Sequence, residues 1–382
     1  MKKILVLGGV GAMASETTID LVQTSDFEEI MVADINIEKV ESFIKELDDS
    51  RLKAAKINAE SVDEMADLMA GYNVVANGLP RIFCENAIKA AIKAKVEMLD
   101  LISPHEETLA LDQEARSAGI SVVGGVGITP GITNILAQLG ADRLDKVERI
   151  DIDFAAFRSI AHSPGLLHVI LWEFDPRTEN RFHYDEGKLI PNPPFSGART
   201  VQFPEPIGAQ TTYFVPHGES QTLSKNIENV KKVYIRGCFP PRAMGLVRML
   251  FDYGLYEAES IEYEGKKIQP LEFISHYLLN SPEGDETDLW GYSVQVEVIG
   301  WLNEHKVMCR FVTTHPPMDK WGGQRAYSKN VGIPLSIGAQ MLAKGKAKKT
   351  GVDGVETMLP AEEFVNQLRK RDFVINESLI YL

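Results

Sequence analysis

The chain has 382 residues, of which 44% are hydrophobic and 25% charged, a composition and length typical of a globular protein with two domains. Its formal net charge of -14 disfavours nucleic acid and anionic membranes as partners, because both bind basic surfaces. No apolar run approaches the ~20 residues of a membrane span, and the cysteines Cys84, Cys238 and Cys309 are far apart. We therefore expect a cytoplasmic protein without a disulfide framework.

The N-terminal segment predicts a nucleotide-binding turn. Ile4 to Leu7 is a short apolar run of the kind that forms a buried parallel strand. It continues into Gly9-Val-Gly11-Ala-Met-Ala14, which fits the pattern G-x-G-x-x-G/A, and a helical segment follows. In this pattern Gly9 allows a tight turn, Gly11 lets the backbone approach a pyrophosphate, and the third position permits close packing of helix on strand.

A second apolar strand, Ile30-Met-Val-Ala-Asp34, ends in an acid that can accept the ribose hydroxyls of the adenosine half of a dinucleotide. The same carboxylate repels a 2′-phosphate, and Ile35-Asn36-Ile37 offers no arginine to bind one. We therefore expect NAD rather than NADP. The alternative is a nucleotide-free α/β domain that keeps the turn for packing.

The first third of the chain alternates strands and helices, which predicts a doubly wound parallel sheet of the Rossmann type. Further strands are expected at 54–57, 73–80, 96–101 and 120–123, and helices at 38–47, 62–69, 84–94 and 105–118. Ligands of such sheets bind beyond the carboxyl ends of the strands. That rule places Asn58, Gly78, Leu79 and Pro80 beside the cofactor.

After Gly124 to Gly131 a helix is expected, and from Val147 to about Met318 the pattern is strand-rich. Val233 to Arg236 and Tyr292 to Val298 alternate like strands with one buried face. This predicts a second α+β domain with a mainly antiparallel sheet. Its expected extent is 129–330, for substrate and dimerisation, after an NAD-binding domain at 1–128. Helices at 334–344 and 361–371 make 331–382 a C-terminal segment that returns to the first domain.

The chain resembles the saccharopine dehydrogenase-like family, and within it the lysine 6-dehydrogenases. The resemblance rests on the glycine turn, on Asn77-Gly-Leu-Pro80 and on Gly127-Ile-Thr-Pro-Gly131. Three later stretches are also similar to family segments: Gly218 to Ser224, Gly332 to Ala339, and Gly351-Val352 with Leu359-Pro-Ala-Glu362.

Two departures bear on the substrate. Lysine 6-dehydrogenases often have Gly-Gly-His after the fifth-strand aspartate, whereas Asp100 is followed here by Leu-Ile-Ser-Pro-His105. The longer Arg-Gly-Thr-Leu-Arg-Tyr segment of the NADP-using saccharopine reductases is shortened here to Arg236-Gly-Cys-Phe-Pro240. The topology and the resemblance together assign the cofactor contacts to Gly9, Gly11, Ala12, Met13, Asp34, Ile35, Asn58, Gly78, Leu79, Pro80, Ser103 and Gly127.

Oxidation of a carbon–nitrogen bond needs a neutral amine, so a histidine or carboxylate must take up a proton while the cofactor supplies the redox chemistry. Asp100 and His105 flank the end of the fifth strand and are the favoured acid–base pair. His217, in Pro216-His-Gly-Glu219, is a third candidate. As alternatives, Asp100 caps a loop, His105 begins a helix and His217 lies in a solvated loop.

Arg236 ends an apolar strand and is assigned to clamp a substrate carboxylate, with a structural salt bridge as the alternative. Thr222, in a segment that resembles the family, is also assigned to the substrate. The sequence has no His-Glu-x-x-His motif and no clustered carboxylates, so no metal is expected.

The residues and the resemblance together imply an NAD-dependent oxidoreductase that acts on the C–N bond of an amino acid. The activity most like it is that of lysine 6-dehydrogenase, which converts a side-chain amine to an imine and then a semialdehyde. The alternative is a saccharopine or carboxyspermidine-type dehydrogenase, whose substrate is a secondary amine with a second carboxylate. A second arginine at the site would favour it, and Arg158, Arg181 and Arg325 are available. A non-catalytic NAD-binding sensor is a third hypothesis. The expected partners are a small amino acid or amine substrate and a second copy of the chain, in a homodimer.

Overall fold

The structure is a computed structural model that describes residues 2–159, 163–280, 291–314, 318–321 and 325–382. The chain forms two compact units. The first contains Met1–Asp145, Lys225–Glu228 and Ser328–Phe373, and the second contains Lys146–Ser224, Asn229–Tyr327 and Val374–Leu382. The first unit thus extends to the start of strand β7, beyond the turn at 124–131 where the sequence pattern changes.

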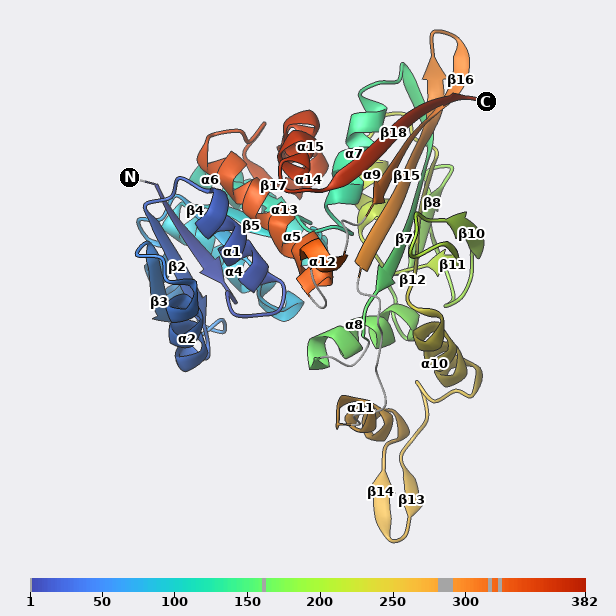
Figure 1. The fold of residues 1–382 in the computed structure, drawn as a ribbon, viewed down its shortest axis with the longest axis horizontal. Helices are drawn as coiled ribbons and strands as arrows, with labels where there is room; N and C mark the ends of the chain where they lie inside the picture. The colour runs from blue at the N-terminus through green and yellow to red at the C-terminus, as the bar shows by residue number, and fades with distance from the viewer. Residues whose placement is uncertain (1, 160–162, 281–290, 315–317, 322–324) are drawn as a thin grey trace. The chain divides into compact units, whose positions relative to one another are not determined.

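The first unit is built on a parallel sheet in the order β17-β6-β5-β4-β1-β2-β3 (Figure 1). Its strands are β1 (Lys3–Leu7), β2 (Glu29–Asp34), β3 (Leu52–Lys56), β4 (Val74–Asn77), β5 (Glu97–Asp100), β6 (Ser121–Gly124) and β17 (Gly351–Gly354). Its helical segments are α1 (Ala14–Thr24), α2 (Ile37–Leu47), α3 (Val62–Met69), η1 (Arg81–Phe83), α4 (Cys84–Ala94), α5 (Glu106–Leu109), α6 (Asp112–Ala118), α7 (Ile132–Ala141), most of α13 (Arg325–Ala343), α14 (Val355–Met358) and α15 (Ala361–Arg369). The predicted Rossmann-type sheet is confirmed.

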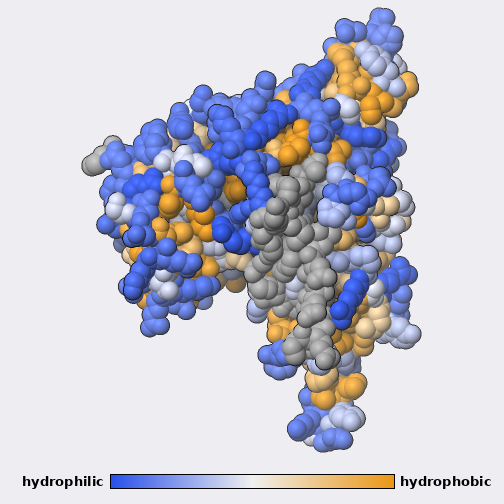
Figure 2. Space-filling model, viewed as in Figure 1, coloured by the Kyte–Doolittle hydropathy of each residue, from blue (hydrophilic) through white to orange (hydrophobic). Residues whose placement is uncertain are grey.

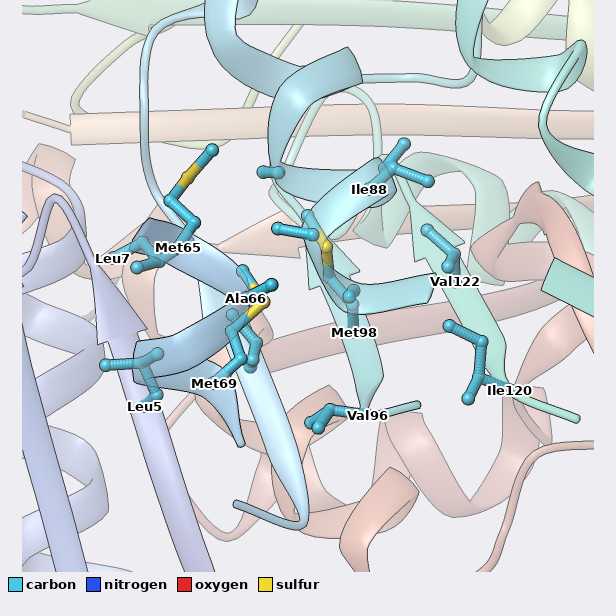
Figure 3. Close-up of a cluster of buried hydrophobic side chains, with 14 of the residues drawn as sticks. Leu5, Leu7, Met65, Ala66, Met69, Ile88, Val96, Met98, Ile120 and Val122 are labelled. Atoms are coloured by element: carbon cyan, nitrogen blue, oxygen red, sulfur yellow. The ribbon is translucent and has the colours of Figure 1, made fainter. Parts of the chain in front are cut away.

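Both faces of this sheet are buried, as parallel strands require. Met98 and Leu99 are neighbours on β5, so their side chains point to opposite faces, and neither is exposed to solvent. Met98 belongs to a cluster with Met65 of α3 and Ile88 of α4 (Figure 3). On the other face, a Cβ added to Gly338 of α13 would lie 2.5 Å from Leu99 Cδ2. With both faces covered by helices, polar groups are left to the strand ends.

Helix α13 begins at Arg325, well before the position predicted from Pro334, which lies inside it. The turn before the proline is held on α1, because Thr17 Oγ1 donates a 2.9 Å hydrogen bond to Gly332 O. A Cβ at Gly332 would lie 2.4 Å from Met13 O. Close packing on α1 therefore supports helical turns that the local sequence does not predict.

The second unit contains a mixed sheet with the order β10-β11-β12-β7-β15-β16-β18, and β8 and β9 attach to it through β12. Strands β7 (Lys146–Phe157) and β12 (Lys232–Cys238) are parallel, and the other pairs are antiparallel, as in the predicted mainly antiparallel sheet. The remaining strands are β8 (Phe182–Asp185), β9 (Lys188–Pro191), β10 (Arg199–Gln202), β11 (Ala209–Phe214), β15 (Gly291–Leu302), β16 (His305–Thr314) and β18 (Val374–Tyr381). Outside the sheet lie α8 (Pro164–Phe174), α9 (Glu219–Asn226), α10 (Pro241–Asp252), the hairpin β13 (Ile261–Tyr263) and β14 (Lys266–Ile268), α11 (Pro270–Asn280) and α12 (Met318–Trp321).

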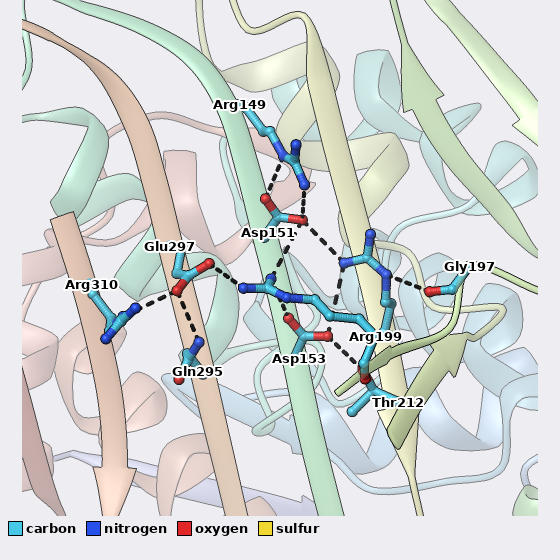
Figure 4. A network of polar contacts seen from close by, with 10 residues as sticks. Arg149, Asp151, Asp153, Gly197, Arg199, Thr212, Gln295, Glu297 and Arg310 are labelled. Carbon is cyan, nitrogen blue, oxygen red and sulfur yellow. Dashed lines mark hydrogen bonds and ion pairs between the residues drawn. The ribbon is translucent and has the colours of Figure 1, made fainter. Parts of the chain in front are cut away.

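Strand β7 separates two kinds of side chain in this sheet. Asp151 and Asp153 point to one face and Phe154 to the other, because successive strand residues alternate. On the Asp153 face, Arg199 Nη1 lies 2.9 Å from Asp153 Oδ2, and Arg199 Nη2 lies 2.7 Å from Glu297 Oε2 (Figure 4). Arg310 Nε contacts Glu297 Oε1 at 3.0 Å. We call these residues, with Arg149, Asp151 and Arg236, the ionic array.

The surface of the molecule includes hydrophobic side chains along the C-terminal edge strand (Figure 2). Val374 and Leu379 of β18 are each 47% exposed, and Tyr381 is 65% exposed. Strand β18 pairs with β16 and ends the sheet order. None of the described helices is long and apolar enough to span a bilayer.

Replacing Arg199 with Met should destabilise the protein by about 3 kcal/mol, because the buried carboxylates of Asp153 and Glu297 would each lose a cation. The measurement is urea unfolding followed by fluorescence and circular dichroism. Arg177→Met is the matched control, since Arg177 forms an ion pair with Asp175 on the surface and its loss should cost less than about 1 kcal/mol. Equal losses from the two variants would contradict a structural role for the array.

Candidate active site

The glycine turn joins β1 to α1 and has the geometry of a phosphate-binding turn. The left-handed residue is Gly8, with a φ of +64°, one position before the Gly9 expected from the pattern. Gly11 N–H donates to Gly8 O at 2.9 Å, which closes the turn. A Cβ on Gly9 would lie 2.6 Å from Val32 Cγ1, so this glycine is needed for packing.

Helix α1 begins without a side-chain cap, because Met13 occupies the N-cap position and makes no side-chain capping hydrogen bond. A Cβ on Gly78, after β4, would lie 2.6 Å from Ala14 Cβ, so the two backbones approach closely here. The positive end of a helix dipole and closely spaced backbone fit a dinucleotide pyrophosphate, which Gly11, Ala12 and Met13 would hold.

The predicted ribose contacts follow β2 and β3. Asp34 ends β2, and its Oδ1 accepts a 3.1 Å hydrogen bond from Asn36 N–H. Ile35 is 74% exposed. Asn58 is an exposed residue after β3 whose Oδ1 accepts from Glu60 N–H at 3.1 Å. The sheet topology therefore brings these residues to the carboxyl edge, with the glycine turn.

Asn77 links the ends of β4 and β5. Its Nδ2 donates to Asp100 Oδ2 at 2.8 Å, and its Oδ1 accepts from Leu79 N–H at 3.2 Å. Leu79 and the adjacent Pro80 lead into η1. The buried amide therefore orients both the fourth-strand loop, predicted to contact the cofactor, and the fifth-strand aspartate.

Asp100 and His105 line one small cavity of ≈ 10 Å³, together with Cys84, Ser103 and Thr108. This volume has room for about one water molecule. Asp100 Oδ1 accepts from Ile102 N–H at 2.8 Å, so both of its oxygens are hydrogen-bonded. The structure thus brings the favoured acid–base pair together, with the buried hydroxyl of Ser103 lacking a hydrogen-bond partner among the described residues.

Burial raises the pKa of Asp100 above its ordinary range, although hydrogen bonds from Ile102 N–H and Asn77 and the charge of His105 oppose the shift. Burial also raises the pKa of the neighbouring Cys84 thiol. His105 lies at the N-cap of α5, where its Nδ1 is 3.1 Å from Ser103 O and its N–H donates to Thr108 Oγ1 at 2.9 Å. These contacts also satisfy the structural alternatives, a loop cap and a helix start.

Gly127 belongs to the loop after β6. Its N–H donates to Pro130 O at 2.9 Å, and a Cβ there would lie 3.1 Å from the same oxygen. After that oxygen, the nearest atoms to such a Cβ are Val331 Cγ1 at 3.5 Å and Leu101 Cδ2 at 3.9 Å. Gly127 as a cofactor contact stays a prediction.

His217 lies in the second unit, buried rather than in a solvated loop. Its ring stacks on Phe154 with centroids 5.2 Å apart, and its Nε2 is 3.1 Å from Glu173 Oε1. Burial lowers the pKa of His217, but the hydrogen bond to Glu173 and the charges of Glu173 and Glu219 outweigh it, so the pKa is raised. A buried histidine with a carboxylate partner can act as a general base.

Arg236 makes the contacts of a structural salt bridge. Its Nη1 is 3.1 Å from Asp151 Oδ1, its Nε donates to Gly197 O at 2.9 Å, and its guanidinium lies over Phe214 and Tyr234. Asp151 and Phe154 are on opposite faces of β7, so Arg236 and His217 are not brought together. The binding of a substrate carboxylate by Arg236 stays a prediction. The contacts with Asp151 and Gly197 favour the structural alternative. Thr222 is buried on α9.

Glu173, the partner of His217, was not singled out by the sequence patterns, whereas Arg158 and Arg181 were named as available second arginines. Glu173 is the acid at the end of the otherwise apolar helix Leu166-Leu-His-Val-Ile-Leu-Trp-Glu-Phe174, a signal that a buried charge is needed there. Arg181 donates to Glu173 O at 2.8 Å. Arg158 is 1% exposed, lies over the Phe239 and Tyr327 rings, and contacts no carboxylate within 4 Å among the described residues.

Among the described residues there is no group of three or more histidine, cysteine, aspartate or glutamate side chains able to hold a metal ion.

The chain is similar to known proteins along nearly its whole length. The saccharopine dehydrogenase NADP binding domain model matches residues 4–123, and the saccharopine dehydrogenase C-terminal domain model matches residues 127–374. Carboxyaminopropylagmatine dehydrogenase of Synechocystis sp. is 23% identical over 94% of each chain. The L-glutamate-forming, NADP(+) saccharopine dehydrogenase of Saccharomyces cerevisiae is 26% identical over 41% of this chain and 34% of its own. The structure of apo histidine-tagged saccharopine dehydrogenase (L-Glu forming) from Saccharomyces cerevisiae superposes with a TM-score of 0.74, at 16% identity and full coverage of both chains.

These matches and the fold define the class of protein as an NAD(P)-dependent dehydrogenase. The chain belongs to the saccharopine dehydrogenase family, as its resemblance predicted.

Proposed function

We propose that the protein oxidises the secondary C–N bond of an amino-acid conjugate, in the manner of a saccharopine or carboxyspermidine-type dehydrogenase. The observation that carries the proposal is the match, along 94% of both chains, to a dehydrogenase named for an agmatine that bears a carboxyaminopropyl group. Such a substrate joins an amino acid to a second skeleton through an amine. The sequence favours lysine 6-dehydrogenase, and that activity remains the second candidate.

The buried arginines support the secondary-amine reading. Arg158 packs on Phe239, which meets the Phe174 ring of α8 at 6.4 Å, and Arg181 bonds the Glu173 carbonyl of the same helix. Both side chains thus lie around α8, with Glu173 and His217. Nε of each arginine has no hydrogen-bond partner among the described residues. A buried guanidinium that contacts no carboxylate, such as that of Arg158, is a ready site for the carboxylate of a substrate.

In this proposal the nicotinamide supplies the redox chemistry when bound, and Gly11, Ala12 and Met13 hold the pyrophosphate. Gly78, Leu79 and Pro80 would place backbone beside it, with Ser103 and Gly127 further along the same edge. The protein residues bind and orient the amine and take up its proton, at Asp100, His105 or His217. The sensor hypothesis differs in predicting cofactor binding without turnover.

A substrate assay separates the candidates. Saccharopine and carboxyaminopropylagmatine should reduce the nicotinamide, and lysine should be turned over with kcat/KM at least about tenfold lower, because it lacks the second arm that binding energy can use. The measurement is absorbance of the reduced nicotinamide with purified protein. Faster turnover of lysine would favour the lysine 6-dehydrogenase candidate, and binding of NAD with no turnover of any amine would favour the sensor.

Cofactor choice is proposed to rest on Asp34, with NAD bound better than NADP. Asp34→Ala should raise NADP affinity by about tenfold, since it removes the repulsion of the 2′-phosphate. Lys56 is the matched control, because it pairs with Asp34 in the sheet register and Lys56→Ala should leave the preference for NAD in place. The measurement is calorimetric titration with each nucleotide. Equal affinity of the unmodified protein for both would overturn the assignment.

We also propose a homodimer formed through the second sheet. Strand β18 presents an edge with exposed Leu379 and Tyr381, and exposed strand edges pair readily with another chain. Light scattering at micromolar concentration should give twice the chain mass, and Leu379→Lys should shift the protein towards monomer. A monomer in the unmodified protein would contradict this proposal.

A further inference from the structure

Three segments of the second unit fix the Glu173–His217 pair. Glu173 comes from the end of α8, and His217 from the segment between β11 and α9. The side chains are 3% and 11% exposed, and Nε2 lies 3.1 Å from Oε1. Phe154 of β7 stacks on the imidazole with an interplanar angle of 17°. The imidazole plane and the direction of its Nε2 are therefore set by packing as well as by the hydrogen bond.

The other two polar atoms of the pair make no hydrogen bond to a described residue. His217 Nδ1 and Glu173 Oε2 are buried and have no hydrogen-bond partner among the described residues. An unmade hydrogen bond on a buried polar atom costs about 1–3 kcal/mol. In the ionic array, by contrast, both oxygens of Asp153 are hydrogen-bonded, Oδ1 by Thr212 and Oδ2 by Arg199. The unsatisfied Nδ1 instead points to a group that arrives with a ligand.

The carboxylate decides which nitrogen of His217 carries the hydrogen. An ionised carboxylate only accepts hydrogen bonds, so the 3.1 Å contact requires Nε2 to donate. Neutral His217 then has its lone pair on Nδ1, the atom without a partner. When Nδ1 takes a proton, the imidazolium lies against Glu173. The other charged groups facing the pair are Glu219 of α9, and Arg181, which contacts the Glu173 carbonyl.

We propose that Glu173 is the positioning residue that makes Nδ1 of His217 the proton acceptor for the substrate amine. One N–H bond of the alkylammonium breaks and an N–H bond forms at Nδ1, which leaves a neutral amine with its lone pair free. The neutral amine is the form that can be oxidised, and the nicotinamide would supply that redox chemistry when bound. The inference deepens the proposed function and rests on it for the identity of the proton donor.

The tautomer and the charge coupling are tested without substrate. Protein labelled with ¹⁵N-histidine is titrated by NMR as the unmodified chain and as Glu173→Gln, Glu173→Asp and the surface control Glu186→Gln. His217 in the unmodified protein should be the Nε2–H tautomer when neutral. Its titration midpoint should fall by about one pH unit or more in Glu173→Gln, recover in part in Glu173→Asp and stay in place in Glu186→Gln. An Nδ1–H tautomer, or an unmoved midpoint in Glu173→Gln, would overturn the proposal.

The role in turnover is tested by the pH profile of kcat/KM with the best amine substrate. The acidic limb should follow the NMR midpoint to lower pH in Glu173→Gln, and kcat should fall about tenfold to hundredfold. A glutamate that served only the fold would lower stability but leave that limb in place, so melting temperatures are recorded for each variant. A limb that stays while the NMR midpoint moves overturns the base role of His217. Absence of turnover in the unmodified protein would instead count against the proposed function, and the NMR result would still decide the pairing.

Discussion

Burial of the central strands on both faces is the constraint on which the positions of the polar groups depend. In the first unit, β5 has Met98 on one face and Leu99 on the other, both without solvent exposure. Its only acid in the buried part of the strand is Asp100, at the carboxyl end. In the second unit, β7 is also buried on both faces, yet it contains Asp151 and Asp153. These two carboxylates are stable there because Arg236 of β12 and Arg199 of β10 reach them (Figure 4).

Side chains of β7 point alternately to the two faces of the sheet. One face therefore has the ion pairs that stabilise the fold, and the other has the candidate acid–base residues. The ionic array occupies one face, where Arg199 bridges Asp153 and Glu297. The other face has Phe154 against His217, with Glu173 beyond the ring. Array carboxylates have arginine partners, whereas His217 Nδ1 and Glu173 Oε2 have none among the described residues. The array charges are neutralised within the fold, and we expect a ligand group at the unpartnered Nδ1 and Oε2.

Sequence reasoning succeeded where a local pattern has one physical meaning. The apolar runs of β1, β2 and β4 to β6 predict buried parallel strands, and the confirmed sheet follows from them. Strand β17 was not predicted, because Gly351–Gly354 is too short and too rich in glycine to show a period. Helix α13 was predicted to start at Pro334, yet packing on α1 supports additional turns before it. The C-terminal segment supplies β17 to the first sheet and β18 to the second.

The candidate site divides in the same way. The glycine turn, Asp34 and the fifth-strand pair follow from sheet topology, so the sequence alone determined where a dinucleotide and an acid–base pair are to be expected. Glu173 was not found, because its partner His217 is 44 positions away and only packing brings them within 3.1 Å. Arg236 is the opposite case. Its position at the end of an apolar strand predicts a clamp for a substrate carboxylate. In the structure it lies opposite Asp153 in the strand register and contacts Asp151 of the ionic array. The hydrophobic period and the motifs of the sequence determine which charged residues lie on each strand. Only the contacts between strands decide which of these charges are neutralised by ion pairs.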